Sequence, residues 1–343
     1  MISSLSLRSF LSILATPAVF ASFPLLLTSC DKHRQSEQKV IALTQIIEHK
    51  AIDAEREGFI AGLKEAGFED GKNVSLKFEN AQGSIAIATQ IANKFVSLNP
   101  SVIIAFSTPS AQSIVSATAR TPIPVIFSTV TDAVAAKIVS TNEAPRSDNV
   151  TGVSDYLAPG PQIECIMRIL PKAKKIGVIY NPGEVNSVLM IKDLKEEAAH
   201  HHLEIVEATT SRTSDVAAAV QSLIGKVDVL HVPNDNTAVA SIEAIIAVGE
   251  KNKVPVIAAD MGSFEAGAVA VAGYDRFLLG KRAAEYAIRV LKGEKASTLP
   301  VRCDHPVQFR VNLKAAESMG LNLDPNQLGG FEVMSDTIHS TRS

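Results

Sequence analysis

The sequence predicts an α/β fold made of two doubly wound, Rossmann-like lobes. Short Val- and Ile-rich runs without polar alternation, such as SVIIAF at 101–106, are typical of parallel strands buried on both faces. Segments of helical periodicity separate these runs, which implies right-handed crossover units in open sheets. The whole series occurs twice at an offset of roughly 130 residues, far longer than a solenoid repeat, so it indicates a duplicated domain.

Each half supplies four strand-like runs, each followed by a helical or polar segment. In the first half the runs are VIALTQ at 40–45, NVSLKF at 73–78, SVIIAF at 101–106 and IPVIFS at 123–128. In the second half the counterparts begin KKIGVIYNPGEVNS at 174, LEIVEATT at 203, DVLHVPNDN at 228 and NKVPVIAADMGS at 252. The predicted lobes are 39–157 with 276–300, and 158–275 with 301–323, joined by a hinge; a polar tail at 324–343 is expected to be disordered.

The first 29 residues read as an export signal. Arg8 precedes a long apolar stretch, and no acidic residue occurs before Asp31. A permanent transmembrane helix is the rival interpretation, because the stretch is nearly long enough to span a bilayer. The end, Leu27-Thr28-Ser29-Cys30, resembles a bacterial lipobox, which predicts lipidation at Cys30. Residues 30–38 then form a lipidated tether that anchors an exported protein to the outer face of the cytoplasmic membrane, on the periplasmic side.

Composition excludes some partners. The formal net charge is -3, and no Lys/Arg-rich stripe with interleaved aromatics occurs, which argues against nucleic acid. Besides Cys30 the chain has Cys165 and Cys303. An oxidising compartment permits a disulfide between them, but buried thiols fit equally well, and spacing does not decide.

Ligands of open α/β sheets bind at the carboxyl ends of the strands, so the residues just past each strand are the candidate site. Almost all are polar, and the Ser, Thr, Asp and Asn residues among them also suit a helix N-cap. Asp132, Asp155, Asp260 and Asp275 look less like caps, because no clear helix starts beside all of them. The candidates found in this way are Gln45, His49, Ser107, Thr108, Thr131, Asp132, Ser154, Asp155, Asn181, Glu184, Asn186, Asp235, Asn236, Asp260 and Tyr274.

Carboxylates favour a cationic group on the ligand, and free helix N-termini favour an anionic one. A zwitterion satisfies both, so the sequence predicts an amino-acid-like solute. Its carboxylate would lie at Ser107–Thr108, and its ammonium on one or two of Asp155, Glu184, Asp235 and Asp260. Gln45 is expected to face Asn181 across the cleft, while the choice between Glu48 and His49 stays open.

Several motifs together resemble a known family. They are QIIEHKAIDAEREGF, FENAQG, FSTPSAQ, STVTDA, NVTGVSD, YNPGEVNS, VPNDNT and GYDRFLLG, in this order between about Val40 and Glu294. The order and spacing look like those of the solute-binding subunits of ABC importers of the tryptophan/tyrosine type. This resemblance implies a type I periplasmic binding fold, a Venus flytrap that closes on a small solute, with an ABC permease and its ATPase as partners. It implies pocket roles for Gln45, His49, Thr108, Gln112, Asp132, Asp155, Asn181, Glu184, Asn186, Asp235 and Tyr274.

One position departs from the family pattern. Members commonly carry Thr-Asp-Pro where this chain has Thr131-Asp132-Ala133, which makes the loop less rigid. The aromatic residues near strand ends that could stack on a solute ring are few, and each also suits a core or hinge position. They are Phe106, Tyr156, Tyr180, Phe264 and Tyr274.

The sequence argues against catalysis. Ser107, His49 and Asp132 can be drawn as a triad, but no Gly-x-Ser-x-Gly elbow surrounds any serine. No cofactor is expected, because GAVAVAG at 267–273 lacks the dinucleotide-binding order and no P-loop occurs. No metal site is expected either, since the triplet His200–His202 suits a solvated helix end. The stronger rival is a sensor of the same fold that signals to a membrane partner.

Overall fold

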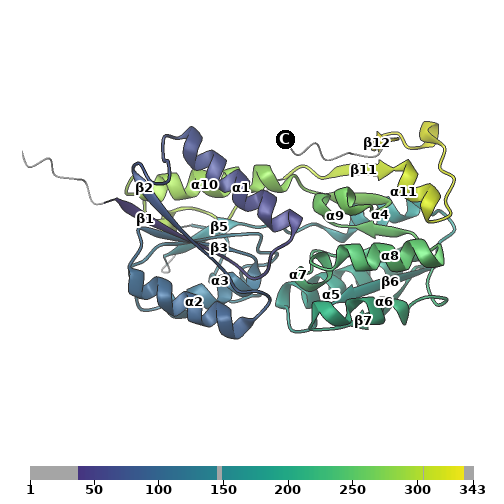
Figure 1. The fold of residues 1–343 in the computed structure, drawn as a ribbon, viewed down its shortest axis with the longest axis horizontal. Helices are drawn as coiled ribbons and strands as arrows, with labels where there is room; N and C mark the ends of the chain where they lie inside the picture. The colour runs from purple at the N-terminus through teal and green to yellow at the C-terminus, as the bar shows by residue number, and fades with distance from the viewer. Residues whose placement is uncertain (1–37, 145–148, 304, 336–343) are drawn as a thin grey trace, which may run out of the picture. The chain divides into compact units, whose positions relative to one another are not determined.

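The computed structural model describes residues 38–144, 149–303 and 305–335, and two α/β sheets organise them (Figure 1). The predicted signal peptide at 1–29, the lipidation site Cys30 and the tether up to residue 37 lie outside these residues, as does the end of the chain from residue 336. Across the described ranges, no helix combines the length and hydropathy needed to cross a bilayer.

The first sheet is parallel throughout, in the order β2-β1-β3-β4-β5. Four helices cover it, and the last of them comes from much later in the chain. The strands are β1 Lys39–Gln45, β2 Val74–Asn80, β3 Val102–Phe106, β4 Val125–Ser128 and β5 Val150–Val153; the helices are α1 Lys50–Glu65, α2 Ile85–Leu98, α3 Thr108–Thr118 and α10 Arg276–Leu291.

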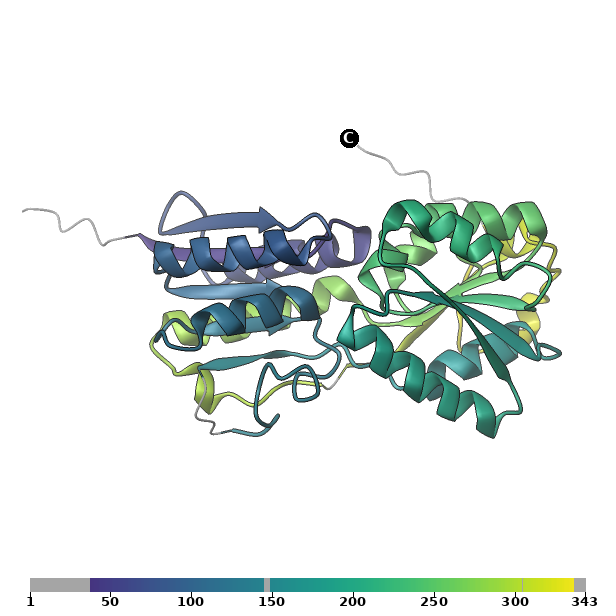
Figure 2. The same ribbon diagram turned by 90° about the horizontal axis from the view of Figure 1, so that it is seen from below.

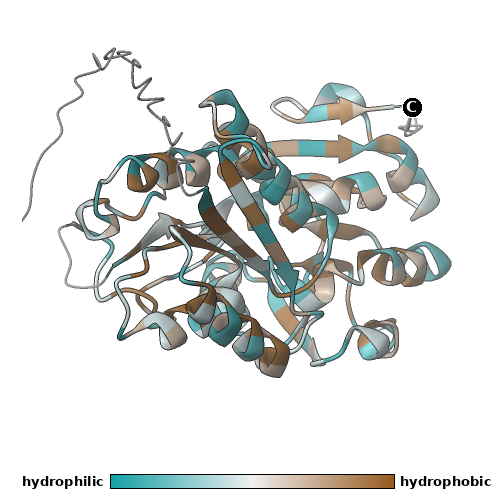
Figure 3. Ribbon diagram, turned by 60° about the vertical axis from the view of Figure 1, so that its left-hand side comes forward, coloured by the Kyte–Doolittle hydropathy of each residue, from teal (hydrophilic) through white to brown (hydrophobic). Residues whose placement is uncertain are grey.

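Both faces of this sheet are buried, which explains its continuous apolar runs. Alternate residues of β1 enter different cores: Ile41 and Leu43 pack with α1 and α10, whereas Ala42 packs with α2 and α3. Figures 1 and 2 show α2 and α3 on one side of the sheet and α1 and α10 on the other. The hydrophobic colouring of these strands is visible in Figure 3.

The second sheet has the order β12-β11-β10-β9-β8-β6-β7, and only the β10–β11 pair is antiparallel among its described strands. Its helices share one large core. The strands are β6 Lys175–Tyr180, β7 Glu204–Thr209, β8 Val229–Val232, β9 Val256–Ala258, β10 Ala270–Gly273, β11 Gln308–Asn312 and β12 Glu332–Met334; the helices are α4 Pro159–Ile169, α5 Val185–His200, α6 Val216–Gln221, α7 Asn236–Val239, α8 Ile242–Asn252, α9 Met261–Ala266 and α11 Leu313–Ser318. Short 3-10 turns are at Thr213–Asp215, Ala296–Thr298 and Pro325–Gln327.

Helix α10 packs tightly along α1, although the two are more than 200 positions apart in sequence. Glycines make this approach possible. A Cβ atom at Gly280 would lie 1.8 Å from the carbonyl oxygen of Glu55, and one at Gly58 would lie 2.0 Å from that of Phe277. These backbones touch directly, so the side chains at the start of α10 are fixed relative to α1.

The chain passes between the two sheets three times: from β5 to α4, from β10 to α10, and from the turn at Ala296–Thr298 to β11. In the last passage Arg302 forms a bridge with Val153 beside the first crossing. The segments between the lobes therefore run together, which is the arrangement expected of a hinge.

The sequence-based expectation of a disordered tail at 324–343 is wrong for part of that range. Residues 332–334 form β12, the edge strand of the second sheet, which pairs with β11. Phe331 packs edge-on against Phe309 at 5.5 Å between ring centroids, and Arg310 forms an ion pair with Glu332 at 2.6 Å. These contacts offset the low hydrophobicity of the segment.

The structure also answers the question that spacing left open for the cysteines. Cys165 is a buried free thiol in the core of the second lobe, so it forms no disulfide with the exposed Cys303. Burial raises the pKa of the Cys165 thiol to about 12, which keeps it protonated and unreactive.

Candidate functional site

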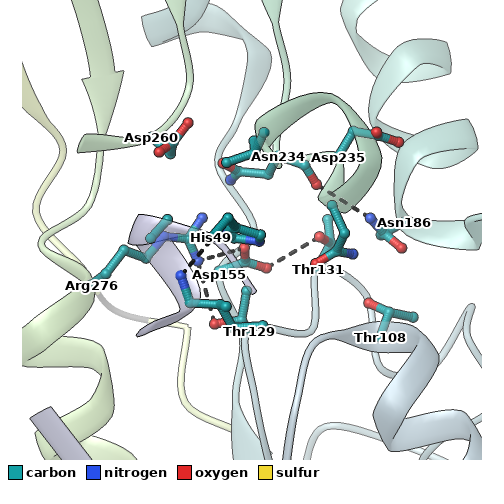
Figure 4. Close-up of a pocket in the computed structure, with 14 residues that line it drawn as sticks. His49, Thr108, Thr129, Thr131, Asp155, Asn186, Asn234, Asp235, Asp260 and Arg276 are labelled. Carbon is teal, nitrogen blue, oxygen red and sulfur yellow. Dashed lines mark hydrogen bonds and ion pairs between the residues drawn. The ribbon is translucent and has the colours of Figure 1, made fainter. Parts of the chain in front are cut away.

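A cavity lies where strand ends of both sheets meet (Figure 4). The space inside it that a water-sized molecule can occupy is about 20 Å³. This is far below the roughly 300–1,000 Å³ of typical small-molecule sites, so a solute needs more room than this arrangement of the lobes provides. Its lining is mostly polar, with three aliphatic side chains. The lining residues are His49, Ala51, Ile52, Thr108, Thr129, Thr131, Asp155, Asn186, Asn234, Asp235, Asn236, Val239, Asp260 and Arg276.

Parallel strands explain why these residues converge. Thr108 follows β3, Thr129 follows β4, and Asp155 follows β5. In the second lobe, Asn234 follows β8 and Asp260 follows β9. The carboxyl ends of parallel strands lie at one edge of a sheet, and here both such edges line the same cavity.

The charged part of the cavity centres on Arg276, the first residue of α10, whose side chain is 5% exposed. Its Nη1 donates to Asp155 Oδ2 at 2.9 Å and lies 3.7 Å from Glu55 Oε2. Thr131 Oγ1 donates to the other oxygen of Asp155 at 3.1 Å. Figure 4 shows Asp155 between Arg276 and Thr131, with a dashed line to each.

Glu55, on α1, lies behind this part of the cavity and is fully buried. Its two carboxylate oxygens accept hydrogen bonds from the hydroxyls of Ser128 and Thr129. Burial raises the pKa of Glu55 to about 7, although Arg276 and both hydroxyls act to lower it. The guanidinium of Arg276 therefore interacts with two buried carboxylates, those of Asp155 and Glu55.

Two residues after strands of the first sheet adopt left-handed backbone conformations. Thr129 has φ 58° and Ser107 has φ 82°. A β-branched residue is rare in this region, and such strain costs roughly 1–3 kcal/mol, so it persists only where neighbours enforce it. The hydrogen bond from Thr129 to Glu55 is one such constraint.

The second lobe contributes a different wall. Asp235 is fully buried; it caps α7 by accepting from Ala238 N at 2.7 Å, and it also accepts from Asn181 N at 2.8 Å and Ser187 Oγ at 2.6 Å. Burial, then the neighbouring Glu184, raises the pKa of Asp235 to about 7, against the effect of these hydrogen bonds. Glu184 itself accepts from the side-chain amide of Asn236 at 2.5 Å.

His49 lies between the two walls. Its Nδ1 accepts from Ile52 N at 3.3 Å, which caps α1 and assigns the hydrogen of the neutral ring to Nε2. Burial lowers the pKa of His49, with Asp260 acting in the opposite direction, so the ring is neutral at pH 7. Of the two neighbours, His49 lines the cavity and Glu48 is exposed.

Buried polar atoms without a protein partner concentrate at this cavity. Across the described residues they are the Nε2 of His49, the Oδ1 of Asn186, both side-chain polar atoms of Asn234 and the Nε of Arg276, with Thr44 and His231 elsewhere. An unsatisfied buried polar group costs about 1–3 kcal/mol. Four residues of the lining therefore present unpartnered polar atoms at the cavity.

Half of the residues proposed from sequence line the cavity. These are His49, Thr108, Thr131, Asp155, Asn186, Asp235, Asn236 and Asp260. The other half do not: Gln45, Ser107, Gln112, Asp132, Ser154, Asn181, Glu184 and Tyr274.

The expected pairing of Gln45 with Asn181 across the cleft is wrong. Gln45 is buried within the first lobe, where its side chain donates to Asp53 at 3.0 Å and accepts from Arg56 at 2.6 Å. Asn181 bonds within the second lobe, where it donates to Thr237 at 3.0 Å. Each side chain supports its own lobe.

The remaining residues outside the cavity lining mostly brace loops around it. Ser154 donates to the carbonyl of Thr131, and Gln112 donates to that of Ala136, both at 3.0 Å. Asp132 accepts from two backbone N–H groups of its own turn. Ser107 Oγ is 3.4 Å from Ser110 Oγ, and Tyr274 donates to the carbonyl of Tyr156 at 2.7 Å.

Two aspartates expected not to be caps are caps. Asp260 accepts a hydrogen bond from Ser263 N and is the N-cap of α9. Asp275 accepts one from Leu278 N and is the N-cap of α10. Asp260 lines the cavity as well, so capping and cavity lining coincide there. None of the five aromatic residues considered from sequence, Phe106, Tyr156, Tyr180, Phe264 and Tyr274, lines the cavity.

The candidates chosen from sequence omit Arg276, Glu55, Thr129 and Asn234, although the strand-end runs from which they were chosen contain Thr129 and Asn234. The last two stand at strand ends and differ from chosen neighbours only in side-chain direction. Glu55 had a signal, because it occupies the same helical face as the buried Ile52, Phe59 and Leu63. A charged residue on an apolar face predicts a buried ion pair.

Two lobes of mostly parallel sheet around a polar cavity define a solute-binding protein of the periplasmic type. The family model described as "ABC transporter substrate binding protein" matches residues 40–328. The chain therefore belongs to this family, whose members are solute-binding proteins and not enzymes.

Three similar proteins refine this assignment. A protein of Clostridioides difficile named "Tyrosine-binding protein" is 41% identical over 296 residues, which is 85% of each chain. A domain from Streptococcus pneumoniae, solved in complex with L-Trp, has a TM-score of 0.82 at 28% identity and covers 87% of this chain and 100% of its own. The ligand-free, open structure of a substrate-binding protein with adhesive properties from Clostridium difficile has a TM-score of 0.64 at 37% identity and covers 87% and 99%.

Proposed function

We propose that this protein captures an amino-acid-like solute, possessing both a carboxylate and an ammonium group, in the cavity between its lobes. The observation that carries the proposal is the buried Arg276 beside Asp155, with the Nε of Arg276 unpartnered at the cavity. A solute carboxylate would bind this guanidinium. The ammonium would bind Asp155 or Asp260, and the unpartnered oxygens of Asn186 and Asn234 offer further acceptors.

This arrangement revises the position expected for the solute carboxylate. Ser107 does not line the cavity, and Thr108 supplies one hydroxyl there. The buried cation Arg276 is a stronger partner, because charge-assisted hydrogen bonds contribute roughly 1.5–3 kcal/mol each. The side chain of the solute would lie against the aliphatic part of the lining, Ala51, Ile52 and Val239.

The similar proteins favour an aromatic amino acid. One relative is named for tyrosine, and one solved structure contains L-Trp. The TM-score is higher with the L-Trp complex than with the open, ligand-free structure, although sequence identity is lower. This difference supports an arrangement of the lobes like that of a solute complex. Opening then requires hinge motion of the predicted lobes, 39–157 with 276–300 against 158–275 with 301–323.

We further propose that the receptor is exported, anchored through a lipid on Cys30, and delivers its solute to an ABC permease. The supporting observations are the lipobox-like sequence at 27–30 and the family to which the chain belongs. Replacement of the lipidated thiol tests the anchor: Cys30→Ser should move the protein from the membrane fraction to the soluble fraction. Retention of a normally processed Cys30→Ser protein on the membrane would refute the anchor.

A thermal-shift screen with the twenty amino acids tests the solute. A ligand at a hundredfold excess over its Kd stabilises the folded protein by about 2.7 kcal/mol. We expect L-tyrosine or L-tryptophan to give the largest rise in Tm. The amino-acid proposal fails if no amino acid raises the Tm at millimolar concentration.

A further inference from the structure

Glu55 is a buried carboxylate that the solute does not reach. It is absent from the cavity lining, yet it contacts two residues that are part of it: Thr129 donates to Glu55 Oε2, and Arg276 Nη1 lies 3.7 Å from the same oxygen. The hydroxyl of Ser128 donates to the other oxygen. Glu55 therefore acts on the cavity through its neighbours.

The backbone around Glu55 allows little adjustment. Its carbonyl oxygen touches α10 at Gly280, where a Cβ atom would lie only 1.8 Å away. The distance between Glu55 and Arg276 is thus set by the contact of two helices and not by a flexible side chain alone. A change in the charge of Glu55 acts directly on Arg276, whose Nη1 lies 3.7 Å from Glu55 Oε2.

The charges around Glu55 do not balance. From α10 it faces Arg276; from the segment after β5 it faces Asp155; from the end of β4 it faces the neutral hydroxyls of Ser128 and Thr129. Across the cavity, Asp260 of the second lobe acts to raise the pKa of Arg276 and that of His49, whereas Arg276 acts to lower the pKa of His49. With both carboxylates ionised, the buried trio of Glu55, Asp155 and Arg276 has a net charge of about -1, which burial disfavours.

We infer that Glu55 positions Arg276 and Thr129 for the solute carboxylate and takes up a proton when the solute binds. The inference rests on the proposed function, because it requires a solute carboxylate at Arg276. That carboxylate competes with Glu55 for the guanidinium, so ionised Glu55 becomes less favourable in the complex. Protonation of Glu55 then restores the balance of charge.

The direction of the linkage follows from the same geometry. Arg276 influences the pKa of Glu55 more strongly than Asp155 does, so the group that docks on Arg276 dominates over the ammonium near Asp155. Burial already places the pKa of Glu55 at about 7, and the solute carboxylate raises it further. Solute affinity should therefore increase as the pH falls through neutrality, by at most about tenfold per pH unit for one proton.

Calorimetry with L-tyrosine and L-tryptophan tests the inference. Titrations near pH 7 in phosphate and in Tris, two buffers with different ionisation enthalpies, give the number of protons taken up per solute bound. We expect net uptake by the wild-type protein, and less uptake by Glu55→Gln, which imitates the protonated form. The Kd of the wild type should rise several-fold more between pH 6 and pH 8 than that of Glu55→Gln. Glu57→Gln, an exposed position on the same helix, should match the wild type.

Ser128→Ala provides a second variant should Glu55→Gln fail to fold. It removes a hydrogen bond that favours ionised Glu55, and Ser128 does not line the cavity. The pH midpoint of solute affinity should then move upward. Equal proton uptake in the wild type and Glu55→Gln, or an unmoved midpoint in Ser128→Ala, would overturn the inference while solute binding stands. The absence of binding by every amino acid would overturn the proposed function and this inference together.

Discussion

The carboxylates in the two walls of the cavity have different hydrogen-bond and ion-pair partners. In the first-lobe wall, Asp155 and Arg276 line the cavity and Glu55 lies behind them, and the three form an ion cluster with a guanidinium at its centre. The polar part of the second-lobe wall contributes no cation to the cavity lining; it is formed by Asn186, Asn234, Asp235, Asn236 and Asp260, with Glu184 behind Asn236. Its carboxylates accept from backbone N–H groups and side-chain amides. We propose that the first wall discriminates by charge, whereas the second provides acceptors on a preformed hydrogen-bond network.

The contrast has a structural origin. Asp235 and Asp260 follow strands of the second sheet and cap α7 and α9, so their charges already serve helix N-termini. Asp155 follows β5 but caps no helix; its partners are Arg276 and Thr131. A carboxylate held by a guanidinium can exchange that partner for a solute ammonium, while a capping carboxylate gives up helix stability if it does so.

Removal of the cation should have the largest effect. Arg276→Met leaves Glu55 and Asp155 buried without their partner, and breaking such a pair costs about 3–5 kcal/mol. We expect the free energy of unfolding to fall by this amount in urea titrations and binding of L-tyrosine to be lost. Arg289→Met, at a half-exposed ion pair with Glu294, is the control and should cost less than about 1 kcal/mol. Similar losses in both variants would contradict the cluster's importance.

The pH dependence of stability should have the next largest effect, and both walls contribute to it in the same direction, because the folded-state pKa of Asp235 is also about 7. The folded-state pKa of Glu55 is about 7 against an ordinary value of 4.5, so the folded state binds the proton more tightly. This contribution is fully present below about pH 4.5 and is lost as the pH rises through about 7, a change of up to about 3 kcal/mol.

His231 acts in the opposite direction, because burial lowers its pKa to about 4 and its contribution is lost as the pH falls from 6.5. The comparison with Glu55→Gln isolates the glutamate. The stability difference between the variant and the wild type, from urea titrations at several pH values, should shift in favour of the variant as the pH rises. A difference independent of pH would exclude a buried, titrating Glu55.

The ammonium partner should have an intermediate effect. Asp155→Asn keeps the shape of the side chain but removes the charge that a solute ammonium needs. We expect the Kd for L-tyrosine to increase about 10- to 100-fold, since a hydrogen bond to a charged group contributes roughly 1.5–3 kcal/mol. Calorimetry measures it, with Asp193→Asn outside the cavity as the matched control. An unchanged Kd would place the ammonium elsewhere.

The second-lobe wall should show the smallest effect on affinity. Asp235→Asn retains a capping side chain for α7 but weakens the bonds to Asn181 and Ser187. We expect a loss of stability of about 1 kcal/mol and a smaller change in Kd than for Asp155→Asn. Thermal unfolding with and without L-tyrosine checks both. A larger loss of affinity than in Asp155→Asn would reverse the assignment of roles to the walls.

The fold was predictable because its strands carry an unambiguous signal. Strands buried on both faces of a parallel sheet are mostly apolar, as in β3 and β9. β12 escaped prediction because an edge strand at Glu332–Met334 depends on contacts of Phe331 and Arg310, which its own composition does not reveal.

The site was predictable only in part, because a strand end fixes the position of the backbone but not the direction of the side chain. Gln45 is the last residue of β1 and Asn181 directly follows β6, as expected, yet their side chains turn toward Arg56 and Thr237 of their own lobes. Arg276 enters the cavity from a helix that returns more than 200 residues after α1, and only the packing of α10 on α1 reveals it.

The central claim is that Arg276 binds the carboxylate of the solute and Asp155 binds its ammonium group. Calorimetry of the wild-type protein with L-tyrosine, tyramine and 3-(4-hydroxyphenyl)propionate tests it most directly, since the second lacks the carboxylate and the third lacks the ammonium. We predict that L-tyrosine binds and that each truncated ligand binds at least about tenfold more weakly, the cost of one charge-assisted contact. Tyramine binding as tightly as L-tyrosine would contradict the claim.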